Sequence, residues 1–244
     1  IKTIEDEFGF PVLIRGKGGV RLTENGRALL PAIREILNAN DHMDQIVANI
    51  RGMSFGRLRI GTFASASVLW LPKIIEEFSH DYPGIQIEII VGGNDSLISQ
   101  LDESCIDFAI MSNPPQGYEW IHLASDRMLV LLPPGHRLVD KDRVTLDEID
   151  DDPFILSNEG FDYDVSQIIK GSGITPRLSF STMENRGIIA MIQHGLGVTV
   201  MPEMVLDSLE SNVITKELAP CEYRHMGIIV KSVNTASLAA KTFI

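Results

Sequence analysis

GRLRIGTFASASVLWLPKIIEEFSHDYPGIQIEIIV, residues 56–91, has the pattern of a strand, a helix and a second strand. Residues 57–61 and 85–91 are rich in isoleucine and leucine and short enough to be strands, and residues 67–80 between them have a helical pattern. A strand, a helix and a strand in this order form the basic unit of a parallel sheet with helices on its faces. The stretch therefore predicts an α/β fold.

The same alternation continues toward the C-terminus. Helices are predicted at 95–104, 162–171, 184–194 and 235–244, and further strands at 107–112, 128–136, 153–157, 177–181, 197–201 and 226–230. The last strand and helix have too few neighbours to form a third domain, so we expect them to return to the first sheet. The prediction is a first lobe of residues 57–133 plus 213–244 and a second lobe of residues 134–212, with a cleft between them.

A long helical pattern is predicted upstream, from about residue 23 to residue 51. In the division of the chain into segments, residues 25–54 are assigned to this helix. Apolar residues recur along it in alternating steps of three and four, which is the a/d seam of a coiled coil. Asn40 falls on this seam, where an amide restricts the register of the pairing. We expect the helix to pair with a second copy, although packing against the chain's own body would use the same stripe. The seam residues are Leu29, Ile33, Ile36, Asn40, Met43, Val47 and Ile50.

Residues 1–24 have the pattern of the end of a winged helix-turn-helix domain. The apolar residues within 1–8 recur with the spacing of a helix, and Gly9 is expected to end that helix. Residues 12–23 predict a hairpin with basic residues near its tip. An ordinary exposed hairpin is the alternative. The net charge of −12 argues against nucleic acid, but residues 15–27 hold four basic residues and one acid. A basic element is therefore attached to an acidic body.

Composition and motifs favour a folded protein without catalytic chemistry. The chain has no apolar run long enough to cross a membrane and no export signal, so we expect it in the cytoplasm with Cys105 and Cys221 reduced. GMSFG at 52–56 matches G-x-S-x-G, but it lies between a helix and a strand, in the reverse order of a nucleophile elbow. The histidines do not cluster. We expect no enzyme activity, no metal and no cofactor.

Several segments together resemble the LysR-type transcriptional regulators. They follow in order along nearly the whole chain: IKTIEDEFGFPVLIR (1–15), VRLTENG (20–26), GRLRIG (56–61), Leu71-Pro72, Phe78 with Tyr82 and Pro83, DFAI (107–110) and HGLGVTVMP (194–202). The resemblance implies two Rossmann-like lobes of the periplasmic-binding-protein kind, preceded by a linker helix and a winged helix-turn-helix. The family's first helix and most of its recognition helix would precede Ile1, so we expect the chain to be N-terminally incomplete.

The resemblance also implies partners: double-stranded DNA, a second copy in a homodimer, a homotetramer by family habit, and a small-molecule effector. The DNA contacts expected here would position the protein on phosphates or in the minor groove more than they read sequence. They are Lys2, Thr3, Arg15, Lys17 and Arg21. A solute-binding protein of the same bilobed fold is the alternative, but the wing and seam helix stand where its export signal would be.

The effector is expected between the lobes, where short polar residues follow the strands. Ser65 and Ser67 begin a helix whose free N–H groups suit an anion, although simple capping explains them as well. Gly93–Ser96, Met111–Asn113 and Asn158–Asp164 occupy comparable positions, where turns and caps are the alternative. The expected effector contacts are Ala64, Ser65, Ser67, Asn94, Ser96, Met111, Ser112, Phe161, Asp162, Thr182 and Glu184.

Charge suggests the kind of effector. Asp162, Asp164 and Glu184 are acids at positions where many relatives in the family have Ser, Thr or Arg. If two of them face the cleft, a dianion is repelled and an amino acid or amine is favoured. The alternative is that Asp162 and Asp164 are solvated charges at a helix N-terminus.

Overall fold

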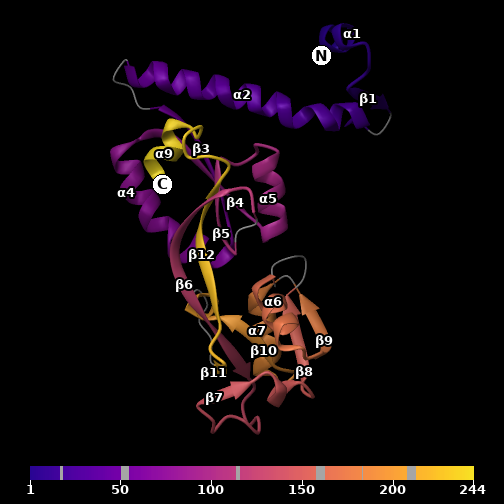
Figure 1. Cartoon of the computed structure of the whole chain (residues 1–244), viewed down its shortest axis with the longest axis vertical. Coiled ribbons are helices and arrows are strands. Elements are labelled where there is room, and N and C mark those ends of the chain that lie inside the picture. Colours follow the sequence, from indigo (N-terminus) through magenta and orange to yellow (C-terminus); the bar gives the residue numbers. More distant parts are fainter. Residues whose placement is uncertain (17–18, 51–54, 114–115, 158–162, 183, 208–212) are drawn as a thin grey trace.

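The chain folds into a two-lobed α/β body crossed at one end by a long helix (Figure 1). A computed structural model describes residues 1–16, 19–50, 55–113, 116–157, 163–182, 184–207 and 213–244, apart from the side chains of residues 42, 45 and 48–50. None of the helices in these ranges has the length and apolar character that crossing a bilayer requires.

The N-terminal segment is a helix and a hairpin, as predicted. It comprises α1 (Lys2–Phe8), β1 (Leu13–Gly16) and β2 (Gly19–Leu22). Gly9 ends α1 in the left-handed conformation, with φ 76°. Glu5 joins the two parts, because its Oε1 accepts hydrogen bonds from the backbone N–H groups of Val12 and Leu13, and these bonds lower the pKa of Glu5.

Helix α2 (Glu24–Ile50) begins and ends within one residue of the predicted bounds. Thr23 caps it, since Thr23 Oγ1 accepts from the N–H of Gly26 at 2.9 Å. Gly26 is required there because a Cβ would collide with the carbonyl oxygen of Val12. The local pattern RLTENG therefore turns the chain from the hairpin into the long helix.

One face of α2 is fixed to the first lobe by polar contacts. Arg34 pairs with Glu103 at 2.6 Å, and Asn38 donates from Nδ2 to the carbonyl oxygen of Ser104 at 3.0 Å. Asn38 also accepts at Oδ1 from Arg59 at 2.9 Å. These contacts join the helix and the first lobe, so the two are expected to move together.

The first lobe has a sheet covered by helices, and the parallel pairing of β3 with β4 and β5 confirms the predicted strand-helix-strand unit. Its core is the apolar cluster around Leu58, Ile60 and Phe108. Its elements are β3 (Phe55–Thr62), α3 (Ala64–Leu69), α4 (Leu71–Asp81), β4 (Gly84–Val91), α5 (Asn94–Asp102), β5 (Phe108–Ser112), β12 (Tyr223–Val230) and α9 (Leu238–Phe243).

The second lobe is smaller and has a core of its own around Phe154, Val198 and Val200. A parallel pair, β8 with β9, lies beside β10 through a bridge between Phe154 and Val198. Its elements are β7 (Arg143–Thr145), the 3₁₀ helix η1 (Asp147–Ile149), β8 (Pro153–Ser157), α6 (Tyr163–Ser172), β9 (Arg177–Thr182), α7 (Asn185–Gln193), β10 (Thr199–Pro202), α8 (Glu203–Asp207) and β11 (Ile214–Ala219).

Strand β6 (Glu119–Leu132) runs through both lobes, and β12 pairs with its first half. The continuous sheet has the order β4-β3-β5-β12-β6-β11-β7, with β10 pairing β6 as well. Figure 1 shows β6 and β12 as the link between the lobes. As predicted, the last strand returns to the first sheet, where it pairs with β5.

Three details of the predicted elements were wrong. The helix expected at 67–80 is two helices that meet at Trp70, because Pro72 lacks the N–H needed to continue the first helix. The strand expected in the run 128–136, stopped by its two prolines, does stop before Pro133, but it begins much earlier, at Glu119. The residues from 213 do not enter the first lobe at once, since β11 pairs with β7 and the distal half of β6.

Candidate effector cavity

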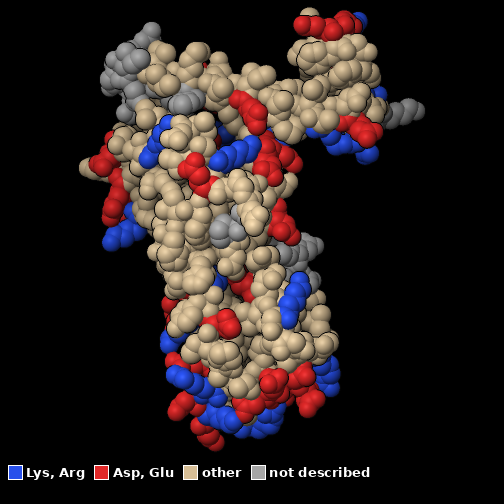
Figure 2. Space-filling model, in the orientation of Figure 1, with Lys and Arg blue, Asp and Glu red and all other residues tan. Residues whose placement is uncertain are grey.

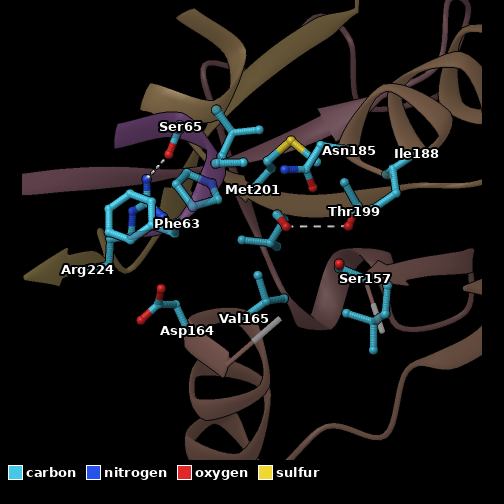
Figure 3. Close-up of a pocket in the computed structure, with 15 residues that line it drawn as sticks. Phe63, Ser65, Ser157, Asp164, Val165, Asn185, Ile188, Thr199, Met201 and Arg224 are labelled. Carbon is cyan, nitrogen blue, oxygen red and sulfur yellow. Dashed lines mark hydrogen bonds between the residues drawn. The ribbon is translucent and has the colours of Figure 1, made fainter. Parts of the chain in front are cut away.

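A cavity of about 70 Å³ lies between the lobes, where the ends of strands and the starts of helices from both lobes meet. Its walls combine apolar side chains with hydroxyl, amide and charged groups (Figure 3). The lining residues are Phe63, Ala64, Ser65, Leu156, Ser157, Asp164, Val165, Asn185, Ile188, Thr199, Val200, Met201, Pro202, Val205 and Arg224.

Arg224, on β12, is the positive charge of this cavity, and its side chain is 7% exposed. Its Nε and Nη2 lie 2.9 and 2.8 Å from Asp126 Oδ2, and Nη2 donates to Ser65 Oγ at 3.2 Å. The guanidinium carbon lies 4.7 Å from the centre of the Phe63 ring, a cation–π contact. Burial lowers the pKa of Arg224, whereas Asp126 and Asp164 raise it, and a guanidinium remains protonated in proteins.

Asp164, in the first turn of α6, connects the two lobes across the cavity. Its Oδ2 accepts from Ser112 Oγ at 2.8 Å and its Oδ1 accepts from Asn113 Nδ2 at 2.7 Å, and both donors lie at the end of β5 in the first lobe. Burial raises the pKa of Asp164, while the hydrogen bond from Ser112 and the charge of Arg224 act in the opposite direction. This carboxylate is therefore a half-buried interlobe contact and not a solvated helix charge.

The far end of the cavity contains hydroxyl and amide groups of the second lobe. Ser157 Oγ is buried and has no hydrogen-bond partner among the described residues. Thr199 Oγ1 donates to the carbonyl oxygen of Ile155 at 2.6 Å. Figure 3 shows Ser157, Thr199 and Asn185 at one end and Arg224, Ser65 and Asp164 at the other. A buried hydroxyl without a partner is costly, so Ser157 is suited to a bound molecule.

The first-lobe residues predicted from the sequence fall into two groups. Ala64 and Ser65 line the cavity, whereas Ser67, one turn along, donates from Oγ to the carbonyl oxygen of Ala64 at 2.7 Å. Neither serine caps α3, whose N-cap residue is Phe63.

Asn94, Met111 and Ser112 are buried and are not among the residues that line the cavity. Asn94 donates from Nδ2 to the carbonyl oxygen of Ser112 at 2.9 Å and so supports the residue that holds Asp164. Ser96 is exposed and accepts from Gln100.

Thr182 and Glu184, the second-lobe predictions that the structure describes, do not line the cavity. Thr182 Oγ1 accepts from the N–H of Glu184 at 3.2 Å, and Glu184 is the exposed N-cap residue of α7. Phe161 and Asp162 lie outside the described residues. Of the three acids from which an amino acid or amine effector was predicted, Asp164 lines the cavity and Glu184 does not.

The sequence reasoning missed the apolar lining residues of the cavity apart from Ala64, and it missed four polar ones: Ser157, Asn185, Thr199 and Arg224. Two of these polar residues have a sequence context that could have pointed to them. Arg224 lies two residues before the apolar run Met226–Val230, and a basic residue that is buried in a strand requires a partner. Ser157 ends β8 directly after three apolar residues. Asn185 and Thr199 carry no pattern that separates them from ordinary cap and strand residues.

The expected DNA contacts lie at the far end of the arm formed by α2. Lys2 and Thr3 are exposed on α1, and Arg15 and Arg21 are exposed on neighbouring strands of the hairpin, while Lys17 lies outside the described residues. Figure 2 shows basic side chains at this end of the arm, next to a few acids.

The apolar seam of α2 is largely exposed, on a different face from Arg34 and Asn38. Ile36 is 69% exposed and Met43 56%, and Ile33 and Val47 are exposed as well. Leu29 is half-buried, Asn40 donates to Asp44 at 3.3 Å, and the side chain of Ile50 lies outside the description. The polar contacts with the first lobe use other residues, so most of the seam remains uncovered.

Comparison with known proteins gives one consistent result. The family model "LysR substrate binding domain" matches residues 51–244. The HTH-type transcriptional regulator YvbU of Bacillus subtilis (strain 168) is 34% identical over all of this chain and 85% of its own length. A full-length variant of OxyR from Pseudomonas aeruginosa superposes with a TM-score of 0.76 at 20% identity, over 99% of this chain and 80% of that one. The effector-binding domain of QuiR in complex with shikimate gives 0.70 at 19% identity, over 78% and 94%.

Proposed function

Because this chain belongs to the LysR family of transcriptional regulators, we propose that the cavity between its lobes is where a small effector controls binding to DNA. The family match and the relatives favour this function over the solute-binding alternative. The relatives are named as transcriptional regulators and not as enzymes.

The interlobe contact of Asp164 is the observation that carries the proposal. Asp164 belongs to the second lobe and binds Ser112 and Asn113 of the first. A molecule in the cavity therefore touches groups that hold the lobes in one arrangement. A ligand that binds this arrangement better than an open one shifts the equilibrium between them.

The fixed contact between α2 and the first lobe supports a route from the cavity to DNA. Arg34 and Asn38 hold the helix on that lobe, and the hairpin with Arg15 and Arg21 lies at the other end of the same helix. A change in lobe arrangement would move the two winged segments of an oligomer relative to each other. In this proposal Lys2, Thr3, Arg15, Lys17 and Arg21 contact phosphates or the minor groove.

The exposed seam of α2 supports self-association as a homodimer, in which Ile33, Ile36 and Met43 would meet their counterparts on a second copy. Pairing of dimers into a homotetramer follows family habit. Since the protein acts on DNA, we place it in the cytoplasm. In QuiR the bound molecule is shikimate, and for this chain we propose a small polar molecule.

DNA binding measured with and without small molecules tests the proposal. Duplexes are selected from a random-sequence library with the protein, and their affinity is followed by fluorescence anisotropy during titration with amino acids, carboxylates and amines. We expect at least one compound to change the Kd for DNA several-fold. Selection of no duplex, or a DNA affinity that ignores every compound, would contradict the proposal.

Two serines of α3 provide a matched pair of variants. Ser65 lines the cavity, and Ser67 lies on the same helix but bonds to its own backbone. Ser65→Ala should weaken the response to the compound, and Ser67→Ala should leave it unchanged. Equal effects of the two substitutions would place the compound elsewhere.

A further inference from the structure

We propose that the effector is an α-amino acid with a short polar side chain, whose carboxylate binds Arg224 and Ser65 and whose ammonium group binds Asp164. This inference rests on the proposed function, because it names the chemistry of the molecule that occupies the same cavity. Three observations carry it: the free donors of Arg224, the charge balance of the cavity, and the polar groups at its far end.

Arg224 has hydrogen-bond donors left for a carboxylate. The contacts of its guanidinium within the described part of the chain use Nε and Nη2, which leaves the two N–H groups of Nη1. Ser65 Oγ accepts from Arg224, so its own hydroxyl proton is available as a further donor. A carboxylate beside Nη1 and Ser65 would receive charge-assisted hydrogen bonds from both residues.

The charges around the cavity disfavour a ligand whose only charged group is a carboxylate. Arg224 is neutralised by Asp126, and Asp164 then stands as a second negative charge in the same buried region. A plain carboxylate would add another uncompensated negative charge, which is costly in a site removed from water. A plain amine would neutralise Asp164 but leave the Nη1 donors of Arg224 without an acceptor.

An α-amino acid satisfies both requirements with adjacent groups. Arg224 and Asp164 interact electrostatically and lie at the same end of the cavity, so one small molecule meets both (Figure 3). Asp164 accepts one hydrogen bond at each oxygen from the first lobe, and each carboxylate oxygen has a second lone pair for an ammonium proton. The ammonium group would thus strengthen the contact that joins the lobes.

The far end of the cavity sets the size and polarity of the side chain. The cavity of about 70 Å³ has room for roughly five to seven water-sized positions, which fits a small amino acid. Ser157 Oγ is buried there without a partner in the described part of the chain. A hydroxyl on the ligand's side chain would give Ser157 a hydrogen bond.

Isothermal titration with L-serine and three molecules that each lack or replace one of its charged groups tests the inference. L-Serine carries all three groups, glycerate replaces the ammonium group by a hydroxyl, 3-hydroxypropionate lacks the ammonium group, and ethanolamine lacks the carboxylate. We expect L-serine to bind at least tenfold more tightly than 3-hydroxypropionate and ethanolamine, with glycerate between them. Equal or tighter binding of 3-hydroxypropionate or of ethanolamine would overturn the inference.

Asp164→Asn gives a second, independent readout. The variant should lose at least tenfold in affinity for L-serine and bind 3-hydroxypropionate more tightly than the unaltered protein does. Asp140→Asn removes the same charge from an exposed position of the second lobe and should change neither value. An unchanged Kd for L-serine in Asp164→Asn would also overturn the inference.

The two proposals fail in different ways. If carboxylates or amines bind and Ser65→Ala weakens them, the amino acid inference falls while the effector cavity stands. If no compound of any class alters DNA binding, both the amino acid inference and the proposed function are contradicted.

Discussion

Asp164 and Arg224 face each other from opposite lobes, although 60 residues of sequence separate them and each belongs to a different local pattern. The acid could be singled out from the sequence because it begins a helix beside a predicted cleft. Its hydrogen bonds to Ser112 and Asn113 could not, because they depend on how the lobes close. Arg224 precedes the predicted strand at 226–230, and local pattern gave it no partner; the pairing of β12 with β6 brings Asp126 beside it.

The raised pKa of Asp164 makes a prediction about stability and pH. A carboxyl whose pKa is higher in the folded than in the unfolded state stabilises the fold fully at pH values below the unfolded pKa. That contribution is lost as the pH rises through the folded pKa. Arg224 and Asp126 are the charges that act on it. Urea unfolding at a series of pH values should show this loss in the unaltered protein and a shallower decline in Asp164→Asn.

The exposed Asp140 again provides the control, since the free energy of unfolding of Asp140→Asn should decline with pH as steeply as that of the unaltered protein. If the stability of Asp164→Asn declines with pH just as steeply, burial does not raise the pKa of Asp164 in the folded protein.

The buried pair of Arg224 and Asp126 should be costly to break. Arg224→Met leaves Asp126 charged and buried, and losing one partner of such a pair costs about 3–5 kcal/mol. Adding Asp126→Asn removes the unpaired charge while keeping an acceptor for the N–H of Met204, so the double variant should recover part of the loss. Chemical denaturation of the single and double variants measures both effects.

An exposed ion pair serves as the comparison. Arg57 pairs with Glu88 on the surface of the first lobe, with its side chain 54% exposed, so Arg57→Met should cost less than about 1 kcal/mol. If Arg224→Met costs no more than Arg57→Met, the buried pair contributes little to folding.

At the scale of elements, periodicity predicted helices well and long strands poorly. Helix α2 has a strong repeat and a capping threonine, so its bounds were predicted to within a residue. Strand β6 was found only in its apolar half, because Glu119–Arg127 is partly exposed and lacks a clear alternation. Short elements such as β7, β11 and α8 were missed, since so few residues give no period.

The seam of α2 predicts the effect of a charge placed on it. Ile36 is the most exposed of the seam residues with a described apolar side chain, and a glutamate there would be buried against a like charge in a symmetric helix pair. Ile36→Glu should convert the dimer to a monomer at micromolar concentration in analytical ultracentrifugation. Ala28→Glu, on another exposed position of the helix, should leave the dimer intact. Dimers that persist in Ile36→Glu would show that the seam is not the contact between copies.

At the scale of the whole molecule, the sequence was sufficient to predict two α/β lobes, an arm and a basic end. The family match and the structural neighbours confirm the two-lobed fold, whereas the role of the basic end stays a prediction. The cavity was predicted only in part, because Ser65, Asp126, Asp164 and Arg224 come from four separate segments that meet only in the fold. Residues next to strand ends could be proposed one lobe at a time, whereas the contacts that close the cavity require both lobes.

Coupling between the cavity and DNA is the central claim, and thermodynamic linkage gives its most direct test. If an effector changes the affinity for DNA by some factor, DNA must change the affinity for that effector by the same factor. The measurement is isothermal titration of the compound that alters DNA binding, once into free protein and once into protein saturated with the selected duplex. We predict two Kd values that differ by the factor found in the DNA titrations; identical Kd values would contradict the claim that this cavity controls DNA binding.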